Sequence, residues 1–335
     1  MLKAGLIGFG GIAVLHREGF ARLKELGVAE LVCACDVNPE AFSKRLTINL
    51  GSESSDFTEN IRYYTDIEEL LKCENVDFFD VCVPSFLHSE ITEKLLLLGY
   101  HVMCEKPMSL TSEDCDRMLA AKDKSGKELM IGQCVRFYPA FDYIKAAIDD
   151  QRFGKVTAAY FERLSPPPTW GWENWFMTPE RSGGCITDLH IHDIDIIRYL
   201  FGEPDAVSCR AATSLSVHDS VHTSLFYGDT PVTAIGDWTL IGMPFRANCR
   251  ISFENATVSY ENNKLTVYRK ASGESYPIPI KDENAYYLEL HYFCKVINGE
   301  LKNERNPALS ARNTVKLIEK MRDSAENSGE VIKLK

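Results

Sequence analysis

Hydrophobic positions in the first 135 residues form short apolar runs that alternate with stretches of helical periodicity. Such runs are typical of strands buried on both faces, and their alternation with amphipathic helices indicates a parallel sheet. The pattern predicts a doubly wound α/β domain over residues 1–135. Strands are expected over residues 3–8, 30–35, 78–83, 101–104 and 129–134, and helices over 12–26, 67–71, 91–98 and 112–121.

After Pro139 the pattern changes, and longer alternating segments with polar turns replace the short apolar runs. This pattern is typical of an antiparallel sheet with one exposed face. It predicts an α+β domain over residues 136–335 with a large, mainly antiparallel open sheet, and a closing helix over about 308–326 as a candidate to pack back on the first domain. Expected here are helices over 143–148, 186–200, 285–297 and 310–326, a strand over 156–163, a loop over 166–179 and several strands over 207–280.

The composition agrees with two domains and restricts the partners. A chain of 335 residues exceeds the size at which single cores stop growing. A formal net charge of −11 without a basic block disfavours a nucleic-acid partner. The eleven cysteines are scattered, several of them within apolar runs, which predicts buried thiols in a reducing cytoplasm. The uncharged run over residues 5–15 is too short for a membrane span and lacks a signal-peptide cleavage site.

A glycine-rich loop lies between the first expected strand and the first expected helix. Residues 8–13, Gly-Phe-Gly-Gly-Ile-Ala, fit the G-x-G-x-x-A pattern of a Rossmann dinucleotide-binding domain. We expect Gly8 to make the tight turn and Gly10 to let the backbone approach the pyrophosphate. Gly11 and Ile12 begin the helix, whose backbone N–H groups and positive dipole end suit phosphate.

Asp36 ends the second expected strand, 23 residues after Ala13. A carboxylate at this point accepts hydrogen bonds from the adenosine ribose hydroxyls and repels a 2′-phosphate. No arginine follows it directly, since Arg45 lies nine residues further on. The sequence therefore predicts NAD as the cofactor in preference to NADP.

Two further motifs complete the pattern. Glu105-Lys106-Pro107 follows the fourth strand, and residues 183–195 read Gly-Gly-Cys-Ile-Thr-Asp-Leu-His-Ile-His-Asp-Ile-Asp. With the glycine loop in front, this order resembles the glucose–fructose oxidoreductase / inositol dehydrogenase / MocA (Gfo/Idh/MocA) family over nearly the whole chain. The resemblance implies a dehydrogenase or reductase with a dinucleotide domain and a substrate domain.

The resemblance also implies that Lys106, Asp188 and His192 are the catalytic residues. Positions 188 and 192 are one helical turn apart, so the carboxylate is expected to orient the imidazole. A histidine accepts the proton of an alcohol as the hydride leaves its carbon. Lys106 is suited to hold the substrate hydroxyl and to stabilise developing alkoxide charge. A helix-surface Asp–His pair and a lysine at a strand end are the structural alternative.

His190 departs from the glycine that many members of the resembling family carry. It has three open roles: to reach the substrate, to replace an ordered water, or to pack between the domains. His190-x-His192 also resembles a metal-binding pair. Because residues two apart on a helix diverge by about 200°, no catalytic metal is expected.

The remaining candidates are less specific. The resemblance implies that Pro84-Ser85-Phe86-Leu87-His88 lines the nicotinamide, with Pro84 and His88 among the cofactor contacts beside Glu105 and Lys106. Helix capping by Ser85 is the structural alternative. Arg136, Tyr138, Trp175 and His190 are candidate substrate contacts. Trp170, Trp172 and Trp175 present aromatic faces suited to sugar C–H surfaces, and core packing or a subunit interface explains them equally well.

These observations predict an NAD-dependent oxidoreductase that acts on a secondary alcohol of a sugar, cyclitol or related polyol. Two alternatives within the resembling family are a glycosidase that uses NAD for transient oxidation and a non-catalytic dinucleotide-binding regulator. A metallohydrolase is a third alternative, and it would need zinc and no nucleotide. The family resemblance implies a homodimer or a homotetramer.

Overall fold

The structure is a computed structural model that describes residues 1–43, 61–270 and 272–334. The chain forms two compact units. Unit 1 contains Met1–Cys134, Gly171–Trp175 and Glu283–Asn313, and unit 2 contains Val135–Trp170, Phe176–Asp282 and Thr314–Lys335.

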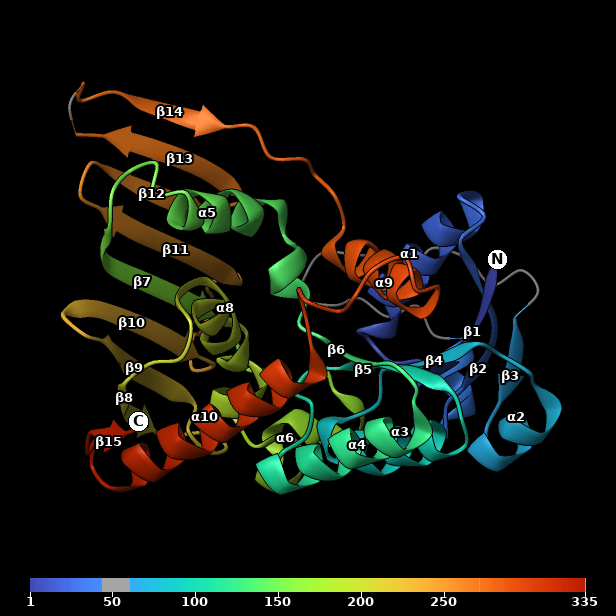
Figure 1. The fold of residues 1–335 in the computed structure, drawn as a ribbon. Coiled ribbons are helices and arrows are strands. Elements are labelled where there is room, and N and C mark those ends of the chain that lie inside the picture. Colours follow the sequence, from blue (N-terminus) through green and yellow to red (C-terminus); the bar gives the residue numbers. More distant parts are fainter. Residues whose placement is uncertain (44–60, 271, 335) are drawn as a thin grey trace. The chain divides into compact units, whose positions relative to one another are not determined.

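Unit 1 is built on a parallel sheet with the strand order β3-β2-β1-β4-β5-β6 (Figure 1). The five expected strands are confirmed, and a short strand over Arg62–Tyr64 was missed because it is too short to show an apolar pattern. The order reverses between β1 and β4, which is where doubly wound sheets bind ligands at their carboxyl ends. The strands are β1 (Leu2–Ile7), β2 (Ala29–Cys35), β3 (Arg62–Tyr64), β4 (Phe78–Val81), β5 (His101–Glu105) and β6 (Leu129–Gly132).

Helices cover the sheet of unit 1 on both faces (Figure 1). Two of them begin with side-chain caps, since Asp66 accepts the backbone N–H of Glu69 and Thr111 accepts that of Asp114. The helices are α1 (Ala13–Glu25), α2 (Ile67–Cys73), α3 (His88–Leu97), α4 (Ser112–Ser125) and α9 (Ala285–Ile297).

Helix α9 lies far along the sequence but belongs to unit 1. It packs against α1, and its Leu290 and Phe293 share a buried core with Phe20, Phe78 and Met103. The sequence-based division placed this helix after residue 135, with the rest of the second half. Its apolar face is buried in the first unit instead, because the core around β1, β4 and β5 is completed by these late residues.

Unit 2 is built on a mainly antiparallel sheet, as predicted, with the order β14-β13-β12-β11-β7-β10-β9-β8-β15. Only β7 and β10 pair in parallel among its described strands. The strands are β7 (Val156–Leu164), β8 (Ala206–Ala212), β9 (Ser220–Tyr227), β10 (Thr230–Asp237), β11 (Arg246–Phe253), β12 (Ala256–Glu261), β13 (Lys264–Arg269), β14 (Ser275–Ile278) and β15 (Ile332–Lys333). The helices are α5 (Pro139–Asp149), α6 (Pro179–Ser182), α7 (Cys185–Asp188), α8 (Ile191–Phe201) and α10 (Ala308–Glu326), and the division between the units falls inside α10.

The expectation of one continuous helix over residues 186–200 is wrong. The helix is interrupted between α7 and α8, where the N–H of His190 bonds to the carbonyl of Cys185, five residues back. The side chain of His190 explains the interruption, because it hydrogen-bonds to Thr223 on β9 and packs against Gly236 on β10.

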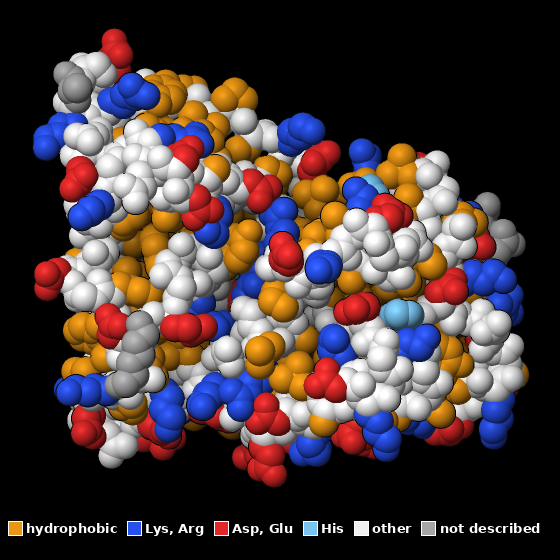
Figure 2. Space-filling view, viewed as in Figure 1, with side chains coloured by type: hydrophobic (Ala, Val, Ile, Leu, Met, Phe, Trp, Pro, Cys, Tyr) orange, Lys and Arg blue, Asp and Glu red, His pale blue; other side chains and the backbone are white. Residues whose placement is uncertain are grey.

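Acidic and basic side chains are interspersed over the face shown in Figure 2, so the net negative charge is not gathered into one field in this view. Within the described part of the chain, no helix combines the length and the apolar character that crossing a membrane requires.

Candidate active site and cofactor site

The glycine loop follows β1 and turns into α1. Gly8 has a φ of +92°, and a Cβ at this position would lie 2.5 Å from the carbonyl oxygen of Cys82. Both the conformation and the close approach require glycine here. At Gly10, by contrast, a Cβ would meet no described atom within 4 Å, so open space adjoins the loop backbone where the pyrophosphate is expected.

The N-terminus of α1 has no side-chain cap. Ile12 occupies the N-cap position in a helical conformation, and its apolar side chain makes no cap hydrogen bond, while the N–H groups of Val14 and Leu15 bond to the carbonyls of Gly11 and Ile12. Gly11 and Ile12 lie half-buried beside it. Uncapped N–H groups at a helix N-terminus favour an anion, so this end of α1 fits a phosphate group.

Asp36 lies directly after β2, at the same carboxyl edge of the sheet as the glycine loop. Its Oδ2 accepts the backbone N–H of Phe9 at 2.7 Å, and its Oδ1 accepts that of Asn38 at 2.8 Å. The half-buried carboxylate is therefore fixed beside the loop, with lone pairs remaining for further donors. Arg45, which follows Asp36 by nine residues in the sequence, lies outside the described residues.

The loops after β4 and β5 lie at this edge too. His88 joins them, because its Nδ1 lies 2.7 Å from the carbonyl oxygen of Pro107 and its Nε2 lies 2.9 Å from that of Val83. Burial lowers the pKa of His88 in spite of these two carbonyl groups. Capping by Ser85 is wrong, since neither the turn over Ser85–Leu87 nor α3 has a side-chain cap.

Glu105 and Lys106 come from the end of β5. The side chain of Glu105 is buried, and its Oε2 accepts the backbone N–H of Lys106 at 3.1 Å. Lys106 is half-buried. Five predicted cofactor contacts thus lie at strand ends or in the following loops, along one sheet edge: Gly8, Asp36, Pro84, Glu105 and Lys106.

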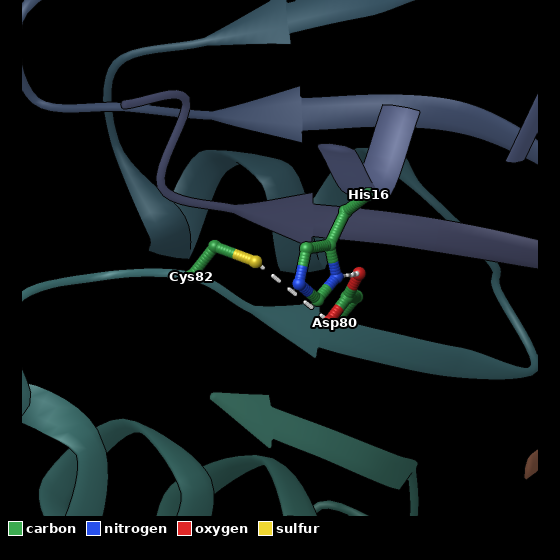
Figure 3. A group of neighbouring side chains, drawn as sticks. All are labelled: His16, Asp80 and Cys82. Carbon is green, nitrogen blue, oxygen red and sulfur yellow. Dashed lines mark hydrogen bonds and ion pairs between the residues drawn. The ribbon is translucent and has the colours of Figure 1, made fainter. Parts of the chain in front are cut away.

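A group of buried polar side chains near this edge belongs to none of the sequence motifs. Figure 3 shows His16 of α1 with Asp80 of β4 and Cys82, and the Nδ1 of His16 lies 2.7 Å from Asp80 Oδ2. Its Nε2 lies 2.9 Å from Glu105 Oε1. One signal was present in the sequence, since Asp80 interrupts an otherwise apolar strand.

Asp188 and His192 lie in unit 2, on the two sides of the helix interruption. Asp188 is the last residue of α7 and is buried, and His192 is half-buried in the first turn of α8. The residues between them keep right-handed helical angles. The predicted triad therefore has Lys106 in unit 1 and its other two members in unit 2.

The four predicted substrate contacts are placed as follows. Arg136 is buried and donates two hydrogen bonds of 2.7 Å to the carboxylate of Asp195. Its guanidinium therefore forms an ion pair within unit 2. His190 is fully buried, and its Nε2 lies 2.9 Å from Thr223 Oγ1. Burial lowers the pKa of His190 to about 3. Tyr138 and Trp175 are half-buried.

The parallel sheet, the glycine loop and the fixed carboxylate after β2 define a dinucleotide-binding enzyme of the doubly wound class. Residues 2–133 match the family model described as an oxidoreductase family with an NAD-binding Rossmann fold, and residues 141–269 match the GFO/IDH/MocA C-terminal domain. The chain belongs to the Gfo/Idh/MocA oxidoreductase family and is an NAD-dependent oxidoreductase.

Relatives agree with this assignment. The chain is 33% identical over 260 residues to the 1,5-anhydro-D-fructose reductase of Ensifer adhaerens, covering 70% of this chain and 73% of the relative. It is 26% identical over 330 residues to the inositol 2-dehydrogenase of Rhizobium meliloti (strain 1021), covering 92% and 93%. The WlbA dehydrogenase of Bordetella pertussis, solved with NADH and UDP-GlcNAcA, has the same fold, with a TM-score of 0.84 at 22% identity over 100% of this chain and 99% of that one.

Proposed function

We propose that the protein transfers a hydride between a secondary alcohol of a sugar, cyclitol or related polyol and NAD. One observation carries the proposal: the glycine loop, the Asp36 carboxylate and Lys106 lie along the same carboxyl edge of one parallel sheet. The relatives that act on inositol and on 1,5-anhydro-D-fructose support the substrate class.

The residues present fit the dinucleotide. The open space at Gly10 and the uncapped start of α1 suit the pyrophosphate, and Asp36 suits a ribose with free hydroxyls. Gly8, Gly11 and Ile12 shape this loop. Pro84, His88, Glu105 and Lys106 belong to the nicotinamide end. Bound NAD supplies the hydride acceptor, or the hydride donor in the reverse direction.

The catalytic roles follow from the chemistry of an alcohol oxidation. His192 accepts the hydroxyl proton, and Asp188 orients its imidazole. Lys106 holds the reacting oxygen and stabilises its developing negative charge. Tyr138 and Trp175 remain the proposed substrate contacts. Arg136 and His190 are buried and hydrogen-bonded to other side chains of unit 2, which supports structural roles for these two residues.

We also propose that the protein works in the cytoplasm as a homodimer or homotetramer. No disulfide joins any of the described cysteines, and ten of the eleven are buried, which suits a reducing compartment. The large open sheet of unit 2 offers a face on which copies can associate. Sedimentation analysis measures the oligomeric state.

The test is a panel of polyols and sugars, including myo-inositol, with NAD or NADP, and of the ketone 1,5-anhydro-D-fructose with NADH or NADPH. Absorbance of the reduced cofactor is the readout in both directions. Lys106→Ala should abolish the reaction, and Lys124→Ala on the exposed side of α4 should leave it unchanged. Product release without net NADH would replace the dehydrogenase with the transient-oxidation alternative. NAD binding with no turnover of any member would favour the regulator.

A further inference from the structure

Four secondary-structure elements of unit 1 contribute ionisable side chains to a buried cluster with no assigned role. We call it the His16 cluster, because the nitrogen, oxygen and sulfur atoms of its side chains come together around His16 in the core of unit 1. Its members are His16 (α1), Asp80 (β4), Cys82 after β4, Glu105 (β5) and Glu289 (α9), and each is at most 5% exposed.

Both ring nitrogens of His16 contact carboxylates, at 2.7 Å to Asp80 and 2.9 Å to Glu105. An ionised carboxylate only accepts hydrogen bonds, so two such contacts require a hydrogen on each nitrogen, which makes the ring an imidazolium. Burial would lower the pKa of His16, but the charge and hydrogen-bonding effects of Asp80 and Cys82 together hold the pKa well above its ordinary value. The ring of Tyr286 covers the imidazole at 5.4 Å between centroids.

Glu105 contacts both His16 and the backbone of Lys106. Its Oε1 faces His16, and its Oε2 accepts the backbone N–H of Lys106 at 3.1 Å. A Cβ on Gly132 would lie 2.8 Å from Glu105 Oε1, so the β6 backbone also confines this carboxylate. One side chain therefore joins the buried imidazolium to the backbone of the catalytic lysine.

Glu289 is the remaining carboxyl group of the cluster. Its carboxylate is fully buried, and neither oxygen has a hydrogen-bond partner among the described residues. Burial and the nearby Glu105 hold its pKa well above the ordinary value. A neutral acid at Glu289 avoids a further uncompensated negative charge in the buried cluster.

We propose that His16 is a positioning residue, which fixes Glu105 and through it the backbone of Lys106 at the active site. The proposal rests on the catalytic role of Lys106 set out above. Without His16, the Oε1 of Glu105 would lose its hydrogen-bond partner. The carboxylate would then be free to turn, and its Oε2 would no longer be held where it accepts the backbone N–H of Lys106. A small displacement of a group that touches the reacting oxygen lowers turnover strongly.

A bound cation is the rival occupant of the His16 cluster. The donor atoms of His16, Glu105 and Glu289 lie within 4.8 Å of one another, and a histidine ligand backed by a carboxylate such as Asp80 is a familiar arrangement. The 2.9 Å contact of Nε2 to Glu105 favours the proton, because a metal ligand carries no hydrogen on the coordinating nitrogen.

The first experiment needs no substrate. Imidazole ¹⁵N spectra of the whole chain, with His16→Gln for assignment, should show both His16 nitrogens protonated about one pH unit above the ordinary histidine pKa of roughly 6.5. Hydrogen exchange at the Lys106 amide should be about tenfold faster in His16→Gln than in the unaltered protein. A neutral His16, an unchanged exchange rate, or stoichiometric zinc by elemental analysis would overturn the proposal.

The second experiment measures turnover with the substrate found by the panel. His16→Gln should lower kcat by about 10- to 100-fold while the KM for NAD stays within about twofold. His101→Gln, at the start of the same strand β5, is the matched control and should keep kcat. Equal kcat in both variants would refute the positioning role. If the panel yields no substrate, the function proposed above fails, and the spectra and the exchange rates still decide the state of His16.

Discussion

Asp36 accepts a 2.7 Å hydrogen bond from the backbone N–H of Phe9, so the carboxylate after β2 braces the loop that is expected to hold the pyrophosphate. Its second oxygen is braced by the N–H of Asn38. This side chain therefore has two functions, since it fixes the loop backbone and presents negative charge where a ribose hydroxyl or a 2′-phosphate would lie.

The first prediction concerns cofactor choice. The unaltered protein should bind NAD several-fold more tightly than NADP. Asp36→Ala should weaken NAD binding by roughly 10- to 100-fold, which corresponds to the loss of hydrogen bonds to a charged group. Asp36→Arg should reduce or reverse the preference for NAD over NADP. Asp36→Asn is the control that keeps an acceptor but removes the charge. Calorimetry measures both affinities, and an unaltered protein that prefers NADP would contradict the assignment.

The second prediction separates two glycines of the same loop. Gly8→Ala should destabilise the fold by about 1–3 kcal/mol or more, because its φ is +92° and the new Cβ would meet the carbonyl of Cys82. Gly10→Ala should leave the unfolding midpoint nearly unchanged, since its Cβ meets no atom of the described residues within 4 Å, but should weaken NAD binding. Thermal unfolding and calorimetry of both variants test this. Intact NAD affinity in Gly10→Ala would place the pyrophosphate elsewhere.

Local patterns in the sequence were sufficient for much of unit 1. Caps such as Asp66 and Thr111 act within three residues, and the buried strands are largely apolar, so both follow from local patterns. The His16 cluster was not, because His16 and Glu289 come from opposite ends of the chain and meet only through packing of α1 on α9. The interruption at His190 was missed for the same reason, since Thr223 and Gly236 lie on later strands.

The third prediction concerns stability and pH. Glu289 has a raised pKa in the folded state, so above the ordinary carboxyl pKa of about 4.3 the folded protein keeps a proton that the unfolded chain has lost. Stability then falls as pH rises through this window, by up to about 1.4 kcal/mol per pH unit. Glu289→Gln removes this contribution, so its stability relative to the unaltered protein should increase with pH.

Chemical denaturation at a series of pH values measures this difference. Glu25→Gln, at an exposed position of α1, is the control and should show no such trend. His16 adds a slope of the same sign above its ordinary pKa, because its folded pKa is also raised, which is why the comparison is made between Glu289 variants. If the stability of Glu289→Gln relative to the unaltered protein fell as pH rises, Glu289 would be ionised in the fold.

The last prediction concerns the mechanism. His192→Ala should leave NAD binding near normal, because His192 lies in unit 2 and the glycine loop lies in unit 1. Its oxidation rate should fall by about 10²–10⁴, the usual contribution of a positioned general base. Asp188→Asn should also be damaging although its size is preserved, since the amide does not stabilise an imidazolium. Lys106→Ala should abolish turnover and weaken substrate binding.

The pH dependence of turnover distinguishes the two candidate bases. The oxidation rate of the unaltered enzyme should rise with pH as one group loses a proton, and the His192 variant should lose that limb. Steady-state rates of both proteins over the same pH range, at saturating NAD, provide the comparison. Retention of full turnover and of the same limb in His192→Ala would assign the base to Lys106, with Asp188 and His192 left to position the substrate.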